Sequence, residues 1–202
     1  MTYTVLARNP SARLIGAATA SRSLAVGNAV ISVDPAAGAV ASQAWTNRAL
    51  RGQMLAAIAN GSSAADAVAA VAEWDDAPEL RQVAALGWSG APAARSGSSI
   101  SAWAGDEVLR DAVVAGNLLT GRVVLDAMSH VLADPLEQED TAAFTRRLLA
   151  SLTSGEAAGG DARGRQSAAV VVATRQDIVV DLRVDDHPDP LAELSRLLSL
   201  AS

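Results

Sequence analysis

The sequence predicts an α+β fold in which two antiparallel sheets pack together and helices cover their outer faces. Strand-like apolar runs are separated by short turn signals such as Asn-Pro and Asp-Pro, and this favours antiparallel pairing because parallel strands need long crossovers. Groups of these strands alternate with pairs of helix-like segments. The 202 residues are 50% apolar, which is enough for a continuous core. We therefore expect one domain over residues 1–202.

The first half of the chain contains a strand group and a helix pair. Four strands rich in Val, Ile and Ala are expected at 2–8, 13–21, 25–33 and 38–45. Apolar residues at helical spacing then predict two helices, at 46–61 and 62–74. Ser63 and Asp66 form a capping-box pattern at the start of the second helix.

The second half repeats this order and ends on a helix. A second strand group is expected at 80–88, 97–103 and 107–114, and a second helix pair at 121–134 and 137–155. Residues 166–186 have the pattern of a hairpin that turns near Arg175. The last helix is expected within 187–202, with Asp189 as its N-cap and Pro190 at its first position.

The composition excludes several classes of protein. There is no cysteine, so disulfides and thiolate chemistry are excluded. All 16 basic residues are arginine, which excludes a Schiff-base lysine and a P-loop. The net charge is −6 and no basic cluster stands out, so nucleic-acid binding is not expected. We find no signal-peptide or membrane-spanning pattern and expect a cytoplasmic protein with no membrane contact and no cofactor.

Six segments together resemble a known family: "TYTVLARNP", "IGAATASRSLAVGNAV", "GAVASQAWTN", "VAGNLLTG", "AAGGDARGRQSAAVVV" and "VDLRVDDHPDPLAEL". This family is domain of unknown function 1028, which is placed in the N-terminal-nucleophile (Ntn) hydrolase superfamily. The resemblance implies a four-layer αββα sandwich and leaves the reaction open. The opening also resembles proteasome-type β subunits, although the lysine of that group has no counterpart in this chain.

Thr2 is the first candidate catalytic residue. Removal of Met1 would give Thr2 a free α-amine beside its hydroxyl, and such an amine can act as the base that a hydroxyl nucleophile needs. The alternative is that Thr2 is an ordinary β-branched strand residue. Ser21 and Arg22, on the strand that returns past Thr2, are expected to face its amine and to take part in substrate binding.

Two amide side chains are candidates to stabilise an oxyanion. Gln43 lies within an apolar strand, where its amide needs a partner, and Asn117 ends another strand beside Gly116. Asn47, at the transition from strand to helix, is a further candidate donor to substrate. Asn117 beside a glycine is also compatible with a simple turn.

The loop "AGGDARGRQSA" contributes the candidate binding residues Asp161, Arg163 and Gln166. An arginine fork is suited to a carboxylate or phosphate on a ligand, so the expected small-molecule substrate would carry an acidic group. The alternative is that Asp161 and Arg163 form an ion pair that stabilises a long turn.

The resulting hypothesis is an Ntn-type amidohydrolase that cleaves a small amide, with Thr2 as nucleophile and Gln43 and Asn117 as oxyanion donors. Two alternatives stay open. One is a non-catalytic αββα protein for ligand binding or assembly, and the other is a metal-assisted hydrolase that uses Asp185, Asp186 and His187. We expect no metal under the first hypothesis, and a homodimer is left open.

Overall fold

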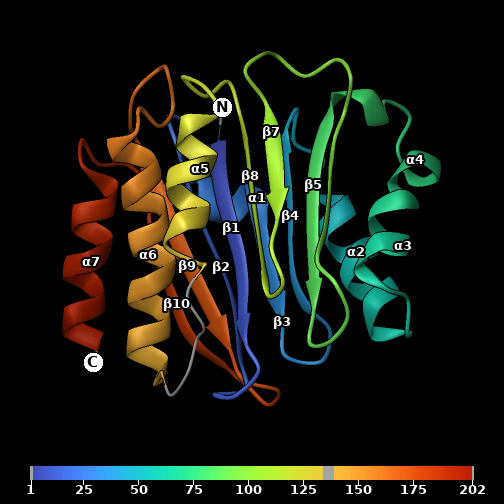
Figure 1. Cartoon of the computed structure of the whole chain (residues 1–202), viewed down its shortest axis with the longest axis horizontal. Coiled ribbons are helices and arrows are strands. Elements are labelled where there is room, and N and C mark those ends of the chain that lie inside the picture. Colours follow the sequence, from blue (N-terminus) through green and yellow to red (C-terminus); the bar gives the residue numbers. More distant parts are fainter. Residues whose placement is uncertain (1, 134–138, 202) are drawn as a thin grey trace.

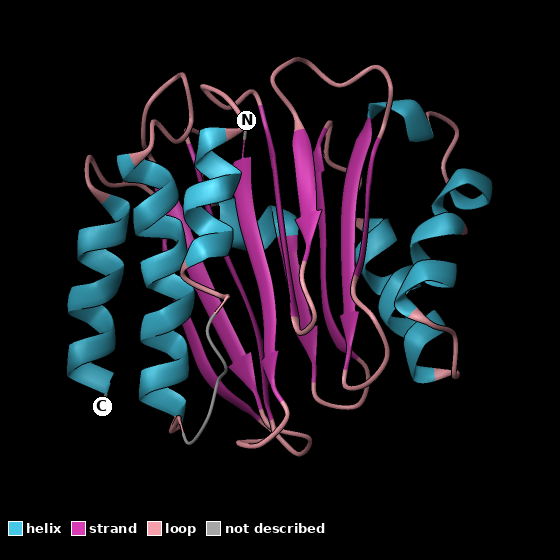
Figure 2. Cartoon of the chain, in the orientation of Figure 1, coloured by secondary structure: helices cyan, strands magenta, loops and turns pink. Residues whose placement is uncertain are grey.

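The computed structural model describes residues 2–133 and 139–201, and it contains two antiparallel sheets with helices on their outer faces (Figure 1, Figure 2). The larger sheet has six strands in the order β10-β9-β2-β1-β8-β7. Their bounds are β1 (Thr2–Asn9), β2 (Leu14–Ser21), β7 (Gly105–Val108), β8 (Ala112–Asn117), β9 (Ser167–Ala173) and β10 (Ile178–Val184). The smaller sheet has the order β3 (Ile31–Asp34), β4 (Gly38–Ala44), β5 (Arg81–Gly87) and β6 (Ala93–Ser96).

Two groups of helices enclose the sheets. The six-stranded sheet is covered by α5 (Val123–His130), α6 (Thr141–Ala157) and α7 (Pro190–Ala201), seen on the left of Figure 1. The four-stranded sheet is covered by α2 (Ala49–Ala59) and α3 (Ala64–Ala69), followed by α4 (Val71–Trp74) and the 3₁₀ turn η1 (Pro78–Leu80). A short helix, α1 (Val26–Val30), joins the two sheets.

The hydrophobic core forms three layers that follow from strand alternation, because successive side chains of a strand point to opposite faces. Tyr3 and Val5 of β1 pack with Phe144 of α6 in the outer layer of the six-stranded sheet. Leu6, the next residue of β1, packs between the two sheets with Leu86 of β5. A third cluster lies between the four-stranded sheet and α2–α3.

The α+β class, the two antiparallel sheets and most of the elements match the sequence predictions. The capping box of α3 is confirmed, since the Asp66 N–H donates to Ser63 Oγ at 3.1 Å. Asp189 caps α7 as expected by accepting from the Ala192 N–H at 3.3 Å. The hairpin of β9 and β10 turns where it was predicted. Parts of some predicted elements and sites lie outside the described residues. These parts are Met1, residue 134, residues 137–138 and Ser202.

The predicted strand at 25–33 is wrong for its first part, because residues 26–30 form α1 and only the end of the segment belongs to β3. Tertiary contacts override the strand preference of these residues. Ala25 has a φ of 54°, and the Val26 N–H donates to Ser167 Oγ at 3.1 Å. A Cβ at Gly27 would lie 2.3 Å from the Ala169 Cβ, so α1 packs against β9 at a distance that requires glycine.

The second strand group also differs from its prediction. No strand is formed at 97–103, and its place next to β5 is taken by β6 at Ala93–Ser96. The predicted strand at 107–114 is a hairpin of β7 and β8, closed by the Leu109 N–H donating to the Ala112 carbonyl at 2.8 Å. Only Arg110 and Asp111 separate the apolar residues on the two sides of this tight turn.

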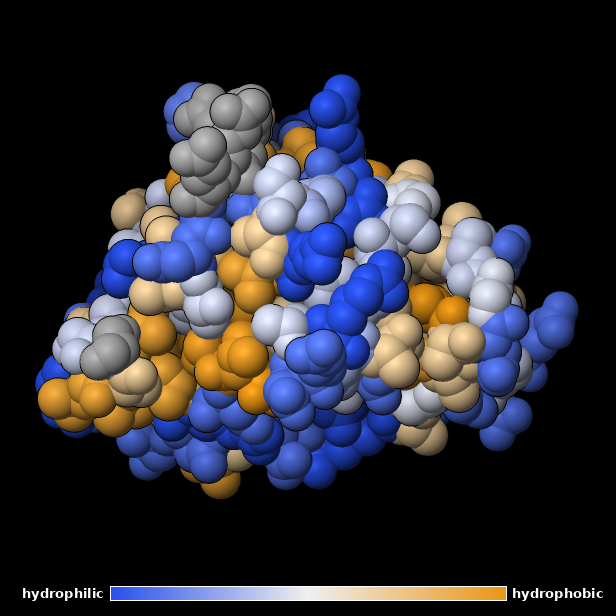
Figure 3. Space-filling view, turned by 90° about the horizontal axis from the view of Figure 1, so that it is seen from below, coloured by the Kyte–Doolittle hydropathy of each residue, from blue (hydrophilic) through white to orange (hydrophobic). Residues whose placement is uncertain are grey.

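None of the helices in residues 2–133 and 139–201 is long and apolar enough to cross a membrane. Figure 3 shows the end of the molecule opposite to the N-terminus, where separate hydrophobic areas lie among hydrophilic ones.

Candidate active site

The layer between the two sheets changes from apolar to polar along its length. On β1, Leu6 faces the other sheet, and the next two residues on the same face are Thr4 and Thr2. On β2, the apolar Ile15 and Ala17 are followed by Thr19 and Ser21 in the same way. Polar groups that lose water need hydrogen-bond partners, so this end of the layer needs an internal network.

Four polar residues form a row across the six-stranded sheet at this end. The strand register places Thr2 beside Asn117 of β8, and Ser21 of β2 pairs with Ser167 of β9. All four residues are buried, and Thr2 is 6% exposed. The Thr2 hydroxyl donates to Ser21 Oγ at 3.3 Å, and this Oγ also accepts from the Ser23 N–H at 3.1 Å.

Gln82 at the start of β5 connects the side-chain amides on both sheets. Its Oε1 accepts from Gln43 Nε2 at 2.7 Å and from Asn117 Nδ2 at 3.0 Å. Its Nε2 contacts the Gly116 carbonyl at 2.9 Å. Gln43 Oε1 in turn accepts from the Thr4 hydroxyl at 2.6 Å. These bonds determine which atom of each side-chain amide is the nitrogen. The NH₂ groups of Gln43 and Asn117 therefore both donate to Gln82 Oε1.

The loop between α6 and β9 crosses over the end of β1. On one side, Asp161 Oδ2 accepts from the Arg22 N–H at 2.8 Å, just beyond the end of β2. On the other side, Asp161 forms a β-bridge with Leu119, just beyond β8. Since β1 lies between β2 and β8, the backbone at Asp161 spans the strand on which Thr2 lies. The Asp161 side chain is fully buried, and its Oδ2 lies 3.2 Å from Arg163 Nη2.

A cavity of about 240 Å³ lies at this end of the molecule. Asn117, the register partner of Thr2, lines it together with Ser23 and Arg163. Ala44 and Leu118, at the ends of strands from different sheets, complete much of the wall and have φ angles of 70° and 52°. Such left-handed backbone costs on the order of 1–3 kcal/mol at a non-glycine residue and is common at functional sites. Strained backbone and buried polar groups therefore coincide here.

A family model and a solved structure both match this chain over most of its length. The model of a family of unknown function, DUF1028, matches residues 2–194. The chain belongs to the DUF1028 family. The crystal structure of protein SPO2555 from Silicibacter pomeroyi, which carries the same family model, is 35% identical with a TM-score of 0.89. The match covers 99% of this chain and 88% of the other. No curated protein matched the chain.

The remaining binding candidates of this DUF1028 chain lie around the site. Arg22 and Gln166 line a neighbouring polar cavity of about 590 Å³, where Arg22 Nη1 donates to Gln166 Oε1 at 2.7 Å. Asn47 is bound to a different element, because its Nδ2 donates to the buried Asp75 at 2.7 Å and its Oδ1 accepts from the Ala49 N–H. Asn47 thus holds the start of α2, whereas Thr2, Ser21, Gln43 and Asn117 are brought together.

Gln82 and Thr4 were not among the residues that the sequence pointed to. Gln82 has the same signal that identified Gln43, a polar amide in an apolar strand, but it stands beside Arg81 at a strand start. A second missed group lies behind Thr2, where the Tyr3 hydroxyl donates to Glu156 Oε2 and Arg165 Nε binds the other oxygen of Glu156. Burial, followed by the hydrogen bond to Glu156, raises the pKa of the Tyr3 hydroxyl above its ordinary value. Tyr3 therefore stays neutral and anchors β1 to the base of the loop.

The Asp185–His187 segment does not have the geometry of a metal centre. Within the described ranges, no three His, Asp or Glu side chains come together as ligands. His187 Nδ1 accepts from the Asp189 N–H at 3.0 Å, and Asp186 Oδ1 accepts from Gln166 Nε2 at 3.1 Å. These contacts give both side chains a structural role at the start of α7.

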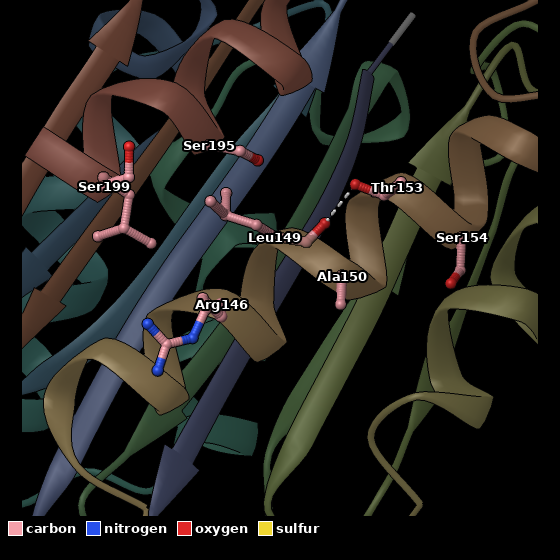
Figure 4. A pocket seen from close by; sticks show the side chains of 8 residues that line it. Arg146, Leu149, Ala150, Thr153, Ser154, Ser195 and Ser199 are labelled. Carbon is pink, nitrogen blue, oxygen red and sulfur yellow. Dashed lines mark hydrogen bonds between the residues drawn. The ribbon is translucent and has the colours of Figure 1, made fainter.

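A further cavity of about 450 Å³ lies between α6 and α7 in the outer helical layer (Figure 4). Arg146, Leu149 and Leu198 are among its lining residues, and the hydroxyl of Thr153 donates to the Leu149 carbonyl at 2.9 Å. The hydroxyls of Ser195 and Ser199 likewise donate to carbonyls of their own helix, and none of the residues that line this cavity is a carboxylate, a histidine or an amine suited to activate a nucleophile. The polar end of the layer between the sheets is the better candidate for chemistry.

Proposed function

We propose that this DUF1028 protein is an N-terminal-nucleophile amidohydrolase in which Thr2, exposed by removal of Met1, attacks a small amide. The observation that carries the proposal is the position of Thr2. The second residue of the chain lies in one polar row with Ser21 and Asn117, beside a cavity that Asn117 lines. The resemblance to Ntn hydrolases supports the same assignment.

The nucleophile and the base of the proposed reaction both belong to Thr2. The Thr2 Oγ1 attacks the carbonyl carbon of the substrate, and its proton passes to the Thr2 α-amine. When the C–N bond breaks, that proton moves to the leaving nitrogen, and the acyl group stays on Oγ1 as an ester. Water then attacks the ester, the amine takes a proton from the water, and Oγ1 is protonated as the carboxylic acid leaves.

The amide network would stabilise the negative charge that develops on the carbonyl oxygen. Each NH₂ group has two hydrogens, and Gln82 Oε1 accepts one from Asn117 and one from Gln43. The second hydrogen of Asn117 belongs to a side chain that lines the cavity, so it is suited to donate to an oxyanion there. Because the donors are held by Gln82, they need little reorganisation during the reaction.

The environment of Thr2 would have to replace the lysine of the proteasome-type sites. Ser21 Oγ lies 3.3 Å from Thr2 Oγ1 and is itself oriented by the Ser23 N–H. In this proposal Ser21 orients the nucleophile, and the loop at Asp161 keeps bulk water away from it.

The test is covalent labelling of purified protein with an alkyne-bearing β-lactone, read by intact mass and peptide mapping. We expect one adduct, equal to the whole lactone, on a protein that lacks Met1 and begins at Thr2. Thr2→Ala should lower the labelling rate by about a hundredfold or more, because the nucleophile is lost. Thr2→Ser should keep part of the rate, because the amine–hydroxyl pair survives.

The matched control is Thr153→Ala, which removes the same hydroxyl from the outer face of α6 and should label normally. A chain extended by a glycine before Thr2 should be as inert as Thr2→Ala, because an amide nitrogen is not a base. Equal labelling of Thr2→Ala, or of protein that retains Met1, would contradict the proposal. Either result would favour the alternative of a non-catalytic protein for ligand binding or assembly.

A further inference from the structure

Trp45 presents an exposed indole on a backbone that is held at both ends. The side chain is 64% exposed, whereas the other three tryptophans are partly buried. The Trp45 N–H donates to the Leu80 carbonyl at 3.3 Å, and its carbonyl accepts from Arg81 Nη1 at 2.7 Å. Arg81 is fixed in turn by the buried Asp75, at 3.0 Å. The backbone that carries this exposed ring is therefore already ordered, so a ligand that binds there does not have to order it.

The contrast with Trp88 shows what a structural tryptophan looks like in this chain. Trp88 Nε1 donates to the Pro35 carbonyl at 2.9 Å, and Arg175 stacks over its ring at 4.8 Å. Within the part of the chain that the structure describes, no hydrogen bond involves Trp45 Nε1 and no cation covers its ring. Trp45 instead lines the cavity beside Asn117.

Arg163 adds a positive charge to the same cavity. It precedes β9 of the six-stranded sheet, whereas Trp45 follows β4 of the four-stranded sheet. Arg163 lines the cavity and its side chain is 43% exposed, while the Asp161 side chain that orients it is fully buried. That carboxylate also accepts the N–H groups of Arg22 and Arg163. The cation is therefore held in place and stays accessible, an arrangement suited to a carboxylate on a ligand.

We propose that the substrate of the Thr2 site is a small amide that carries a flat apolar group, bound against Trp45, and a carboxylate, bound by Arg163. This inference deepens the proposed function and rests on it. The apolar side chains of Ile100 and Leu118 extend the surface that would contact the flat group. The cavity volume of about 240 Å³ lies below the ~300–1,000 Å³ of sites for drug-sized ligands. A group the size of one acylated amino acid fits this limit better than a long peptide.

The test measures binding in the Thr2→Ala background, where turnover is prevented. Three probes separate the two features. N-acetyl-L-phenylalanine has ring and carboxylate, N-acetyl-L-phenylalaninamide has only the ring, and N-acetyl-L-alanine has only the carboxylate. Dissociation constants come from NMR titration of the backbone amide resonances, which every variant keeps. We expect the first probe to bind about tenfold more tightly than either of the others.

The variants should remove these preferences one at a time. Trp45→Ala should weaken only the two ring-bearing probes, and Arg163→Gln only the two carboxylates, each by about tenfold. Leu200→Ala and Arg146→Gln, on α7 and α6, are matched exposed controls and should change nothing. Equal affinity of the three probes, no detectable binding, or preferences that persist in both variants would overturn the inference.

The outcome separates this inference from the proposed reaction. If the lactone labels Thr2 but the probes show no preference, the hydrolase stands and the substrate class is wrong. If the preferences hold and Thr2 does not react, the ligand class stands and the hydrolase is wrong.

Discussion

The two ends of the layer between the sheets are built from the same strands and differ in their side chains. At one end Leu6, Ile15 and Leu86 are almost completely buried in an apolar cluster. At the other, Thr4, Gln43 and Gln82 are equally buried and form a hydrogen-bonded network. Apolar contacts are non-directional, whereas each hydrogen bond fixes an atom in place. The apolar end therefore mainly stabilises the fold, and the polar end holds the candidate catalytic side chains in position.

The two ends should respond differently to mutation. A residue of the apolar end should affect the free energy of unfolding strongly and the reactivity of Thr2 weakly. A residue of the polar end should do the reverse.

The largest stability effect is expected for Leu6→Ala. Leu6 is fully buried, and its removal leaves a cavity between rigid sheets, so the free energy of unfolding should fall by about 2–5 kcal/mol. Urea denaturation measures this loss. The labelling rate of Thr2 per folded molecule should stay within about threefold of wild type, since the strand register is kept by its neighbours. A large fall in the labelling rate without a loss of stability would contradict the assignment of stability to the apolar end and of reactivity to the polar end.

A smaller stability effect and a larger kinetic one are expected for Gln82→Met. Methionine fills a similar volume but offers no amide, so Gln43 and Asn117 lose their common acceptor. The unfolding free energy should fall by about 1–3 kcal/mol, and the labelling rate by more than about tenfold. Gln82→Glu keeps an acceptor oxygen for Gln43 and Asn117 but loses the donor to the Gly116 carbonyl, so it should recover only part of the rate. If Gln82→Met only destabilises the protein, the network has no role in positioning.

The sequence predicted the parts of this molecule that depend on local signals. Strand groups, helix pairs and the caps at Ser63 and Asp189 follow from residue patterns within a few positions. Gln43 could be chosen because a buried amide needs a partner, and Asn117 because it ends a strand beside a glycine. The partner itself, Gln82, has a similar local pattern but lies 39 residues from Gln43, so no local signal shows that the two amides meet.

The features that the sequence did not predict depend on contacts between distant segments. Residues 26–30 are helical because Gly27 allows a close contact with β9, and this contact depends on the fold. Asn47 stays a candidate donor to substrate, but its hydrogen bond to Asp75 joins residues 28 positions apart and has no local signal. Trp45 drew no attention because an exposed tryptophan and a buried one have the same local pattern.

The smallest effect, and the one that sharpens the comparison, concerns pH. The network of Gln43, Gln82 and Thr4 is uncharged, whereas the support of Trp45 depends on Asp75. The hydrogen bond from Arg81, aided by Asn47, lowers the pKa of Asp75 from 3.8 to about 2. A depressed carboxyl pKa stabilises the fold above the unfolded value of 3.8, and this contribution is lost as the pH falls toward 2.

Asp75→Asn should therefore lower the unfolding free energy by up to about 2 kcal/mol at pH 7, and the difference from wild type should shrink below pH 4. Urea denaturation at a series of pH values from 7 to 2.5 measures the difference. Asp126→Asn, which breaks the exposed pair with Arg122, is the control and should cost less than about 0.5 kcal/mol at every pH. A difference for Asp75→Asn that does not change with pH would mean that the Asp75 charge contributes nothing and that only its hydrogen bonds hold Arg81. In that case the charge of Asp75 does not help to hold the backbone of Trp45. The support of Trp45 then resembles the uncharged network of Gln43, Gln82 and Thr4, and the two regions do not differ in their dependence on pH.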